Sequence, residues 1–458
     1  MRADRTHREP GRASRATAER LMPERRLRFF LGVAEIGGYY RDLQRGLEEL
    51  GHDAVFVDLH PQVYRYAGRQ EPKRPGAARF AAWAARRDVA TPRNRALRKT
   101  AWRLTSRSAR VPLFLWAIAT RDVFVYSFAT SFFGFRELPL LRLLGKRTIF
   151  VFHGSDSRPP YLDGSDMALD RGLTTEQCIA LVRRKKDTVR TIERHADVIV
   201  SNPLSSQLHE RPVASFLAIG IPRRAAAGND SPAEVREAVR IVHSPTHPEA
   251  KGTPAIRAAV ERLRGLGLAV DYVEVTGRPN ADVLAELARC DIAVDQLYSD
   301  TPLAGFAAEA ASLGKPVLVG GYGRDAMIDA LAETPFPPVC FCKPEELDQA
   351  LEGLARDALA RTSLGTQAKR FLEEHWDCRV VAARFVRLAD GTAPPSWFHD
   401  PREELYAEGA GLERGHLARI VRAVVAEGGR EALCVGDKPA LERRLLELAE
   451  GAVSGAAD

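Results

Sequence analysis

The sequence predicts an α/β protein with two domains of the same type in series, each a parallel sheet covered by helices. Short β-branched and aromatic runs alternate with longer helical patterns along most of the 458 residues. The alternation stops at a polar link containing Pro and Gly, 222–232, and then starts again. A chain of this length also exceeds a single typical core, so about two to three domains are expected. When two such domains face each other, the carboxyl ends of their sheets border a cleft, which is where open α/β sheets bind ligands.

The first domain is expected at 27–222, as a Rossmann-like unit. The apolar run 27–34 predicts its first strand, and a Gly37-Gly38 turn leads into an amphipathic helix that ends near Gly51. Further strands are expected at 53–59, 122–128, 147–154 and 197–202. The stretch between the second and third strands is too long for a simple crossover. We therefore expect a basic helical insert there, at about 61–120.

The second Rossmann-like domain is expected at 233–375. Its strands are predicted at 239–245, 269–277, 291–297, 316–320 and 339–342, with helical patterns between them. After it, 376–393 predicts a helix that crosses back to the first domain. The composition then changes, and 394–458 predicts a helical appendage to which the sequence assigns no role.

Composition and cysteine usage limit the class of protein. Apolar residues make up 45% and charged residues 28%, as in a folded globular protein. No run reaches the roughly 18–20 apolar residues of a membrane-spanning helix. The arm at 1–26 is rich in Arg, lacks a secretory pattern and is expected to be disordered. The six cysteines are scattered without a C-x-x-C pair, which favours free thiols in the cytoplasm over disulfides or a metal site.

Several residues at predicted strand ends could carry chemistry in the cleft. Lys251 stands between a strand and a helix start, where it could reach a diphosphate together with helix N–H groups; the alternative is a surface lysine. Gly37 and Gly38 allow a phosphate to approach the backbone closely, although turns also use such pairs. His153 ends an apolar strand and could bind a sugar or orient a hydroxyl, unless it is structural.

Glu309 is the carboxylate that we consider first. It lies near the start of a short helix whose other residues are small and apolar, and it could accept hydrogen bonds from a ribose. The alternative is an acid that complements the helix macrodipole and points to solvent.

Several segments together resemble a known family. They read G-G-Y-Y-R-D-L-Q-R-G-L-E-E-L-G-H-D-A-V-F-V from Gly37, F-H-G-S-D-S-R from Phe152, R-H-A-D-V-I-V-S from Arg194, H-S-P-T-H-P-E-A-K-G-T from His243, A-R-C-D-I-A-V-D-Q-L from Ala288 and E-A-A-S-L-G-K-P-V from Glu309. In this order they resemble GT-B-fold glycosyltransferases, particularly the family 4 (group 1) retaining enzymes, over about 27–388. The resemblance implies an N-terminal acceptor domain and a C-terminal domain that binds a nucleotide sugar.

The resemblance also implies roles for individual residues. Glu309 would be the second glutamate of the family's Glu-x7-Glu motif and bind the donor ribose. Lys251 would bind the diphosphate, and His153 would lie near the transferred sugar. Gly37 and Gly38 would border the phosphates. Gly277, after a predicted strand, falls where the nucleobase is usually contacted.

The chain departs from the family pattern in two places. The first glutamate of the motif would fall at Thr301, which carries no charge, and the adjacent Asp300 is the candidate to substitute for it. The family's arginine partner of the lysine is missing where Thr246 and Pro248 stand, and His247 is the nearby candidate for a charge.

These residues lead to two expectations of function. The first is transfer of a hexose from a nucleotide diphosphate sugar to a glycan or lipid-linked acceptor, with retention of configuration and without metal or cofactor. The second is a catalytically degenerate sugar-nucleotide-binding protein, or a partner subunit, of the same fold. The uncharged Thr301 and the missing arginine motivate this second expectation.

The insert carries a strong positive charge. Between Arg65 and Arg110 lie twelve Arg and Lys residues, opposed by Glu71 and Asp88. Such a density indicates an anionic partner or a solvated surface. We favour an anionic membrane surface, which would place the protein peripherally at the inner face of the membrane. Nucleic acid is less favoured, because the aromatics interleaved with the charges lie in amphipathic helical patterns; a solvated helical face or a disordered insert is the other alternative.

Overall fold

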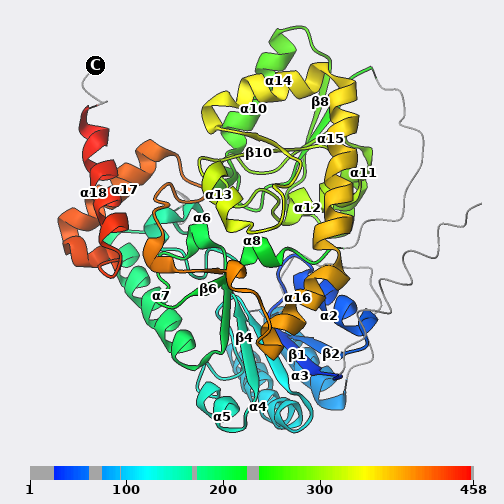
Figure 1. Ribbon diagram of the computed structural model, residues 1–458, viewed down its shortest axis with the longest axis vertical. Coiled ribbons are helices and arrows are strands. Elements are labelled where there is room, and N and C mark those ends of the chain that lie inside the picture. Colours follow the sequence, from blue (N-terminus) through cyan, green and yellow to red (C-terminus); the bar gives the residue numbers. More distant parts are fainter. Residues whose placement is uncertain (1–24, 61–74, 93, 168–172, 224–236, 455–458) are drawn as a thin grey trace, which may run out of the picture.

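The computed structural model describes residues 25–60, 75–92, 94–167, 173–223 and 237–454. Nearly all of the predicted N-terminal arm, and part of the predicted insert, therefore lie outside the described residues. Figure 1 shows two α/β domains, one above the other, with the last helices packed beside the lower, N-terminal domain. The predicted fold class, two Rossmann-like domains with a helical C-terminal appendage, is confirmed.

The N-terminal domain contains a seven-stranded sheet in the order β12-β6-β5-β4-β3-β1-β2. All neighbours pair in parallel except β12, which is antiparallel to β6. The strands are β1 (Arg28–Val33), β2 (Asp53–Asp58), β3 (Val123–Ser127), β4 (Arg147–Val151), β5 (Val198–Ser201), β6 (Val213–Ser215) and β12 (Phe398–His399). Because β12 comes from the appendage, the appendage adds an edge strand to this sheet in addition to its helices.

Helices cover both faces of this sheet. They are α2 (Tyr39–Glu49), α3 (Gly76–Ala90), α4 (Ala96–Thr120), α5 (Leu138–Leu143), α6 (Gly164–Met167), α7 (Thr175–His195) and α8 (Phe216–Ile219). Helix α7 begins with a capping box, in which Thr174 and Gln177 satisfy each other's backbone N–H groups. The appendage helices α17 (Arg414–Gly428) and α18 (Pro439–Ser454) lie beside α7 (Figure 1).

The C-terminal domain contains a five-stranded parallel sheet in the order β11-β10-β9-β7-β8. Its strands are β7 (Val239–His243), β8 (Val270–Glu274), β9 (Ile292–Val294), β10 (Val317–Gly320) and β11 (Cys340–Cys342). Its helices are α9 (Pro248–Lys251), α10 (Thr253–Gly265), α11 (Asn280–Arg289), α12 (Gly305–Ser312), α13 (Arg324–Ala330), α14 (Leu347–Arg356) and α15 (Ala358–Phe371). In both sheets the first strand of the domain lies between the second and the third. The second strand is therefore added on one side of β1 or β7, and the third on the other side. Ligands of such sheets bind at these switch points.

The chain crosses between the domains twice, at adjacent positions. Helix α15 continues through a π-helical turn, Leu372–Trp376, into α16 (Cys378–Asp390), which packs on α2. A Cβ atom at Gly46 of α2 would lie 2.0 Å from the carbonyl oxygen of Cys378, so only glycine permits this helix contact. The first crossing, at Arg223, pairs with the second through backbone hydrogen bonds to Trp376 and Cys378.

All six cysteines lie within the described residues and are free. No helix in the described part of the chain is both long and apolar enough to span a bilayer.

Candidate functional site

The glycine turn after β1 lies at the switch point of the N-terminal sheet. Gly37 and Gly38 have φ of 57° and 83°, the left-handed region that glycine adopts without strain. Gly38 caps α2, and its carbonyl oxygen accepts from the N–H of Asp42 at 3.1 Å. The turn therefore presents the start of α2 to the cleft. The N–H groups of Tyr39 and Tyr40 there donate to the carbonyl oxygen of Ile36 and to the carboxylate of Glu35, at 2.9 and 3.2 Å.

His153 follows β4 and contacts the first turn of α2. Its Nε2 lies 3.0 Å from the hydroxyl of Tyr40, and its backbone N–H donates to the carboxylate of Asp156 at 2.9 Å. The imidazole packs edge-on against Tyr39 and Phe216, with ring centroids 5.2 and 5.5 Å away. Burial among these rings lowers the pKa of His153 to about 3, so the imidazole is neutral at neutral pH. It can act there as a hydrogen-bonding group but not as a cation.

Lys251 lies at the switch point of the C-terminal sheet, at the end of α9. Its Nζ donates to Gln296 at 2.5 Å and lies 3.9 Å from Asp295; both partners follow β9. Gly252 has a φ of 74°, and a Cβ atom there would lie 2.6 Å from Leu297. The left-handed glycine thus allows α9 to end against the β9 loop, which holds the lysine beside the strand ends. His247 contributes its carbonyl oxygen, which accepts from the N–H of Lys251 at 3.0 Å.

Glu309 is buried in α12, with 9% of its surface exposed. The solvent-facing alternative therefore does not hold. Its Oε1 accepts from Asn280 at 3.0 Å and lies 3.9 Å from the guanidinium of Arg223. Burial raises the pKa of Glu309, and the charge of Arg223 opposes that rise. Gly277, with a φ of 63°, lies in the loop that leads to Asn280, the first residue of α11, so the candidate nucleobase and ribose contacts are connected.

Asp300 and Thr301 are held by the N-terminal domain. Asp300 forms a buried ion pair with Arg158, whose guanidinium also lies 2.8 Å from Asp163. Asn202 donates to the carbonyl oxygen of Asp300 at 2.7 Å and to the hydroxyl of Thr301 at 3.2 Å. In this conformation the carboxylate of Asp300 binds an arginine of the facing domain, at the place where the donor sugar was expected.

Three of these contact residues were not predicted as site residues. Arg158 stands in the strand-end segment that begins at Phe152, and its charge could have indicated a role. Asn202 ends a predicted strand, which is a weak signal. Arg223 stands in the polar link between the domains, where no periodicity distinguishes one arginine from another.

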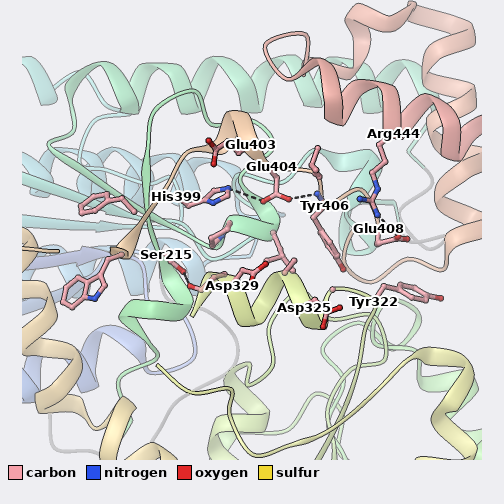
Figure 2. A pocket seen from close by; sticks show the side chains of 18 of the residues that line it. Ser215, Tyr322, Asp325, Asp329, His399, Glu403, Glu404, Tyr406, Glu408 and Arg444 are labelled. Carbon is pink, nitrogen blue, oxygen red and sulfur yellow. Dashed lines mark hydrogen bonds and ion pairs between the residues drawn. The ribbon is translucent and has the colours of Figure 1, made fainter. Parts of the chain in front are cut away.

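A hollow of about 450 Å³ lies at the edge of the two domains, beside the appendage (Figure 2). None of the predicted site residues lines it. Carboxylates from α13 and the appendage face it, and His399 and Glu404 point toward each other with 3.6 Å between Nε2 and Oε2. Glu404 also accepts from the N–H of Tyr406 at 2.5 Å. Burial raises the pKa of Glu404 to about 7.

Comparison with solved structures finds likenesses that span most of the chain. HepE from Anabaena, in complex with UDP and glucose, is 11% identical, with 79% of this chain and 99% of that chain covered and a TM-score of 0.44. The spinosyn rhamnosyltransferase SpnG, complexed with thymidine diphosphate, is 13% identical, with 80% and 100% covered and a TM-score of 0.35. The glycosyltransferase SnogD from Streptomyces nogalater is 14% identical, with 80% and 100% covered and a TM-score of 0.36.

No family model and no curated protein matches the chain. The two facing Rossmann-like domains, joined by two adjacent crossings, form the arrangement known as GT-B.

Proposed function

We propose that this protein transfers a hexose from a nucleotide diphosphate sugar to a glycan or lipid-linked acceptor, with retention of configuration and without metal. One observation supports the proposal most. The guanidinium of Arg223 donates to the carbonyl oxygen of Gly37 at 2.7 Å and lies 3.9 Å from Glu309. The candidate phosphate turn of one domain and the candidate ribose ligand of the other therefore face each other across a short gap.

The reaction assigns a distinct task to each residue. The bond between the anomeric carbon and the donor phosphate breaks, and its electron pair goes to the diphosphate. The acceptor oxygen bonds to the anomeric carbon, and its proton goes to the leaving phosphate. Lys251 stabilises the growing negative charge. The neutral imidazole of His153 would hydrogen-bond the sugar or the acceptor, and Glu309 would bind the ribose.

The variant Lys251→Ala tests this proposal. We expect turnover to fall by at least about a hundredfold, as for other single groups that stabilise a transition-state charge. The assay detects products by mass spectrometry, with a panel of nucleotide sugars and a crude lipid and glycan acceptor pool. Lys369→Ala, in the same domain but on α15, is the matched control and should keep wild-type turnover. Unchanged transfer or donor hydrolysis in Lys251→Ala would contradict the role.

The second candidate function is a degenerate sugar-nucleotide-binding protein or partner subunit. Thr301 has no charge, and the ion pair of Asp300 with Arg158 occupies the carboxylate that was expected to replace the missing glutamate. Calorimetric titration of the wild-type chain with the same nucleotide sugars separates the two candidates. Binding without any product would favour the degenerate protein.

We further propose that α3 and α4 bind an anionic membrane surface, where lipid-linked acceptors reside. Leu97, Leu104 and Val111 are exposed at intervals of seven residues and so share one side of α4. Phe80 and Trp83 are exposed on α3, where they stack with ring centroids 5.9 Å apart. These five apolar residues, and the exposed arginines around them, are called the α3–α4 surface below. Its arginines are Arg79, Arg86, Arg87, Arg95, Arg98, Arg103 and Arg107.

The charge and composition of the α3–α4 surface fit an interfacial helix pair. Asp88 is the acidic residue of the two helices, and it lies 2.9 Å from Lys99. The arginines therefore present a large excess of positive charge next to exposed Trp, Phe and Leu side chains. Such helices lie in the headgroup region, with the apolar side chains inserted and the basic ones on anionic lipids.

A further inference from the structure

Arg223 has a fixed backbone at the point where the chain crosses between the domains. Its N–H donates to the carbonyl oxygen of Trp376 at 3.0 Å, and its own carbonyl oxygen accepts from the N–H of Cys378 at 2.9 Å. The second crossing thus holds the backbone of Arg223 on both sides of the residue.

The guanidinium of Arg223 is buried, with 7% of the residue exposed, yet within the described part of the chain its ion pairs with carboxylates are long. Asp42 lies 3.6 Å away and Glu309 3.9 Å away, whereas charge-assisted hydrogen bonds are usually about 2.7–2.9 Å long. Among the described residues its Nε has no hydrogen-bond partner. A buried guanidinium of this kind retains the capacity to bind another anion.

Two glycines border the guanidinium. A Cβ atom at Gly38 would crowd one terminal nitrogen of Arg223 at 3.2 Å, and one at Gly305 would lie in ordinary contact with the other at 3.8 Å. Gly38 belongs to the candidate phosphate turn, and Gly305 begins α12, the helix of Glu309. The guanidinium therefore lies between the two loops that border the proposed donor.

The other cations of the cleft are more strongly engaged. Arg158 is held by the carboxylates of Asp163 and Asp300. Lys251 donates to Gln296 and carries one positive charge, whereas a diphosphate leaving group carries more than one negative charge. A second cation is needed near Lys251, and His153 is neutral.

From these contacts we propose that Arg223 binds the diphosphate of the nucleotide, as the second cation beside Lys251. A planar guanidinium can bind two phosphate oxygens at once, which a lysine cannot do. The inference rests on the proposed function, because it assumes a nucleoside diphosphate in this cleft. Arg223, in the interdomain link, would then supply the second positive charge that is missing where Thr246 and Pro248 stand.

Isothermal titration of the full chain with UDP, GDP, ADP and TDP, and with the matching nucleosides, tests this inference. In Arg223→Met we expect diphosphate affinity to fall about ten- to hundredfold, which is the range for hydrogen bonds to charged groups. Nucleoside affinity should fall clearly less, because the proposed contacts of Arg223 with the ligand are to phosphate. The readout is the ratio of diphosphate to nucleoside affinity, since Arg223 also faces the candidate ribose ligand Glu309. Arg223→Lys keeps the charge without the planar fork, so its diphosphate affinity should lie between those of wild type and Arg223→Met.

Arg384→Met is the matched control for a purely structural effect at the crossing. Arg384 donates to the carbonyl oxygens of Ile219 and His375, each at 2.8 Å, beside the same crossing. This variant should lower the thermal midpoint and leave the ratio of diphosphate to nucleoside affinity unchanged. An unchanged ratio in Arg223→Met, with wild type binding a diphosphate, would overturn this inference alone. If wild type binds none of the diphosphates, the proposed function fails and this inference fails with it.

Discussion

Glu404 is a buried carboxyl group whose ionisation should make stability depend on pH. Burial raises its pKa from 4.5 to about 7, with His399 facing it from β12. Between these pH values the folded state retains a proton that the unfolded state has lost, so the free energy of unfolding falls as pH rises. The cost of the buried charge is absent below pH 4.5 and complete above pH 7. A Gln side chain can still accept from the N–H of Tyr406, and it carries no charge.

We therefore expect Glu404→Gln to gain stability relative to wild type as pH rises from 5 to 8, by about 2–3 kcal/mol. Chemical denaturation at pH 5 and at pH 8 measures the difference. Glu403→Gln, at the neighbouring exposed carboxylate, is the control and should show no such gain. A difference between Glu404→Gln and wild type that stays constant over this pH range would contradict the buried ionisation of Glu404.

At the scale of single residues, local pattern identified some of the candidate site. Lys251 follows β7 by a short loop, and parallel strands bring such positions to one edge of a sheet, so a place near the strand ends was predictable. Glu309 lies within α12 and was predicted from the small, apolar residues of that helix. Arg223 was not, because its position depends on how the interdomain link pairs with the distant Trp376. The burial of Glu309 also depends on packing between domains, which its helix alone does not define.

Helices α3 and α4 should bind anionic membranes through the α3–α4 surface. If the α3–α4 surface inserts at the headgroups, the chain should co-sediment with vesicles containing anionic phosphatidylserine, and less with neutral phosphatidylcholine vesicles. The variant Leu97→Ser/Leu104→Ser/Val111→Ser should lose most of this binding. Replacing exposed apolar side chains should not weaken the fold, and each of the three lies outside the core of the domain.

A control on the other domain separates apolar insertion from nonspecific attraction. Leu266→Ser, at an exposed position of the C-terminal domain, should bind anionic vesicles like wild type. Raising the salt concentration should weaken binding of wild type, because arginines on lipid headgroups are screened by salt. Equal binding to anionic and neutral vesicles, or full binding by the triple variant, would contradict the membrane proposal.

At the scale of elements, strand positions followed closely from the apolar runs. Both parallel sheets could be predicted because β-branched runs that alternate with helices leave few other arrangements. Strands β6 and β12 did not follow from the apolar runs. They are three and two residues long, and they pair with each other although they lie far apart in the sequence.

At the scale of the whole molecule, the contacts between domains decide what the cleft can bind. Arg158 of the N-terminal domain and Asp300 of the C-terminal domain pair at a buried position, and Asn202 adds hydrogen bonds to the same loop. The sequence does not predict these contacts, because each domain forms its sheet without them. They also hold the candidate sugar-binding carboxylate against the opposite domain.

The interdomain ion pair between Arg158 and Asp300 should contribute to the stability of the protein. Arg158→Met leaves the carboxylates of Asp163 and Asp300 buried without their shared cation, so we expect a loss of about 3–5 kcal/mol of stability. Asp300→Asn leaves Arg158 paired with Asp163 at 2.8 Å and should cost clearly less. Because Asp300→Asn weakens a contact between the domains, small-angle scattering should also show a larger radius of gyration than for wild type. Equal losses of stability in the two variants, measured by denaturation, would contradict the role of Asp163 as the second carboxylate on Arg158.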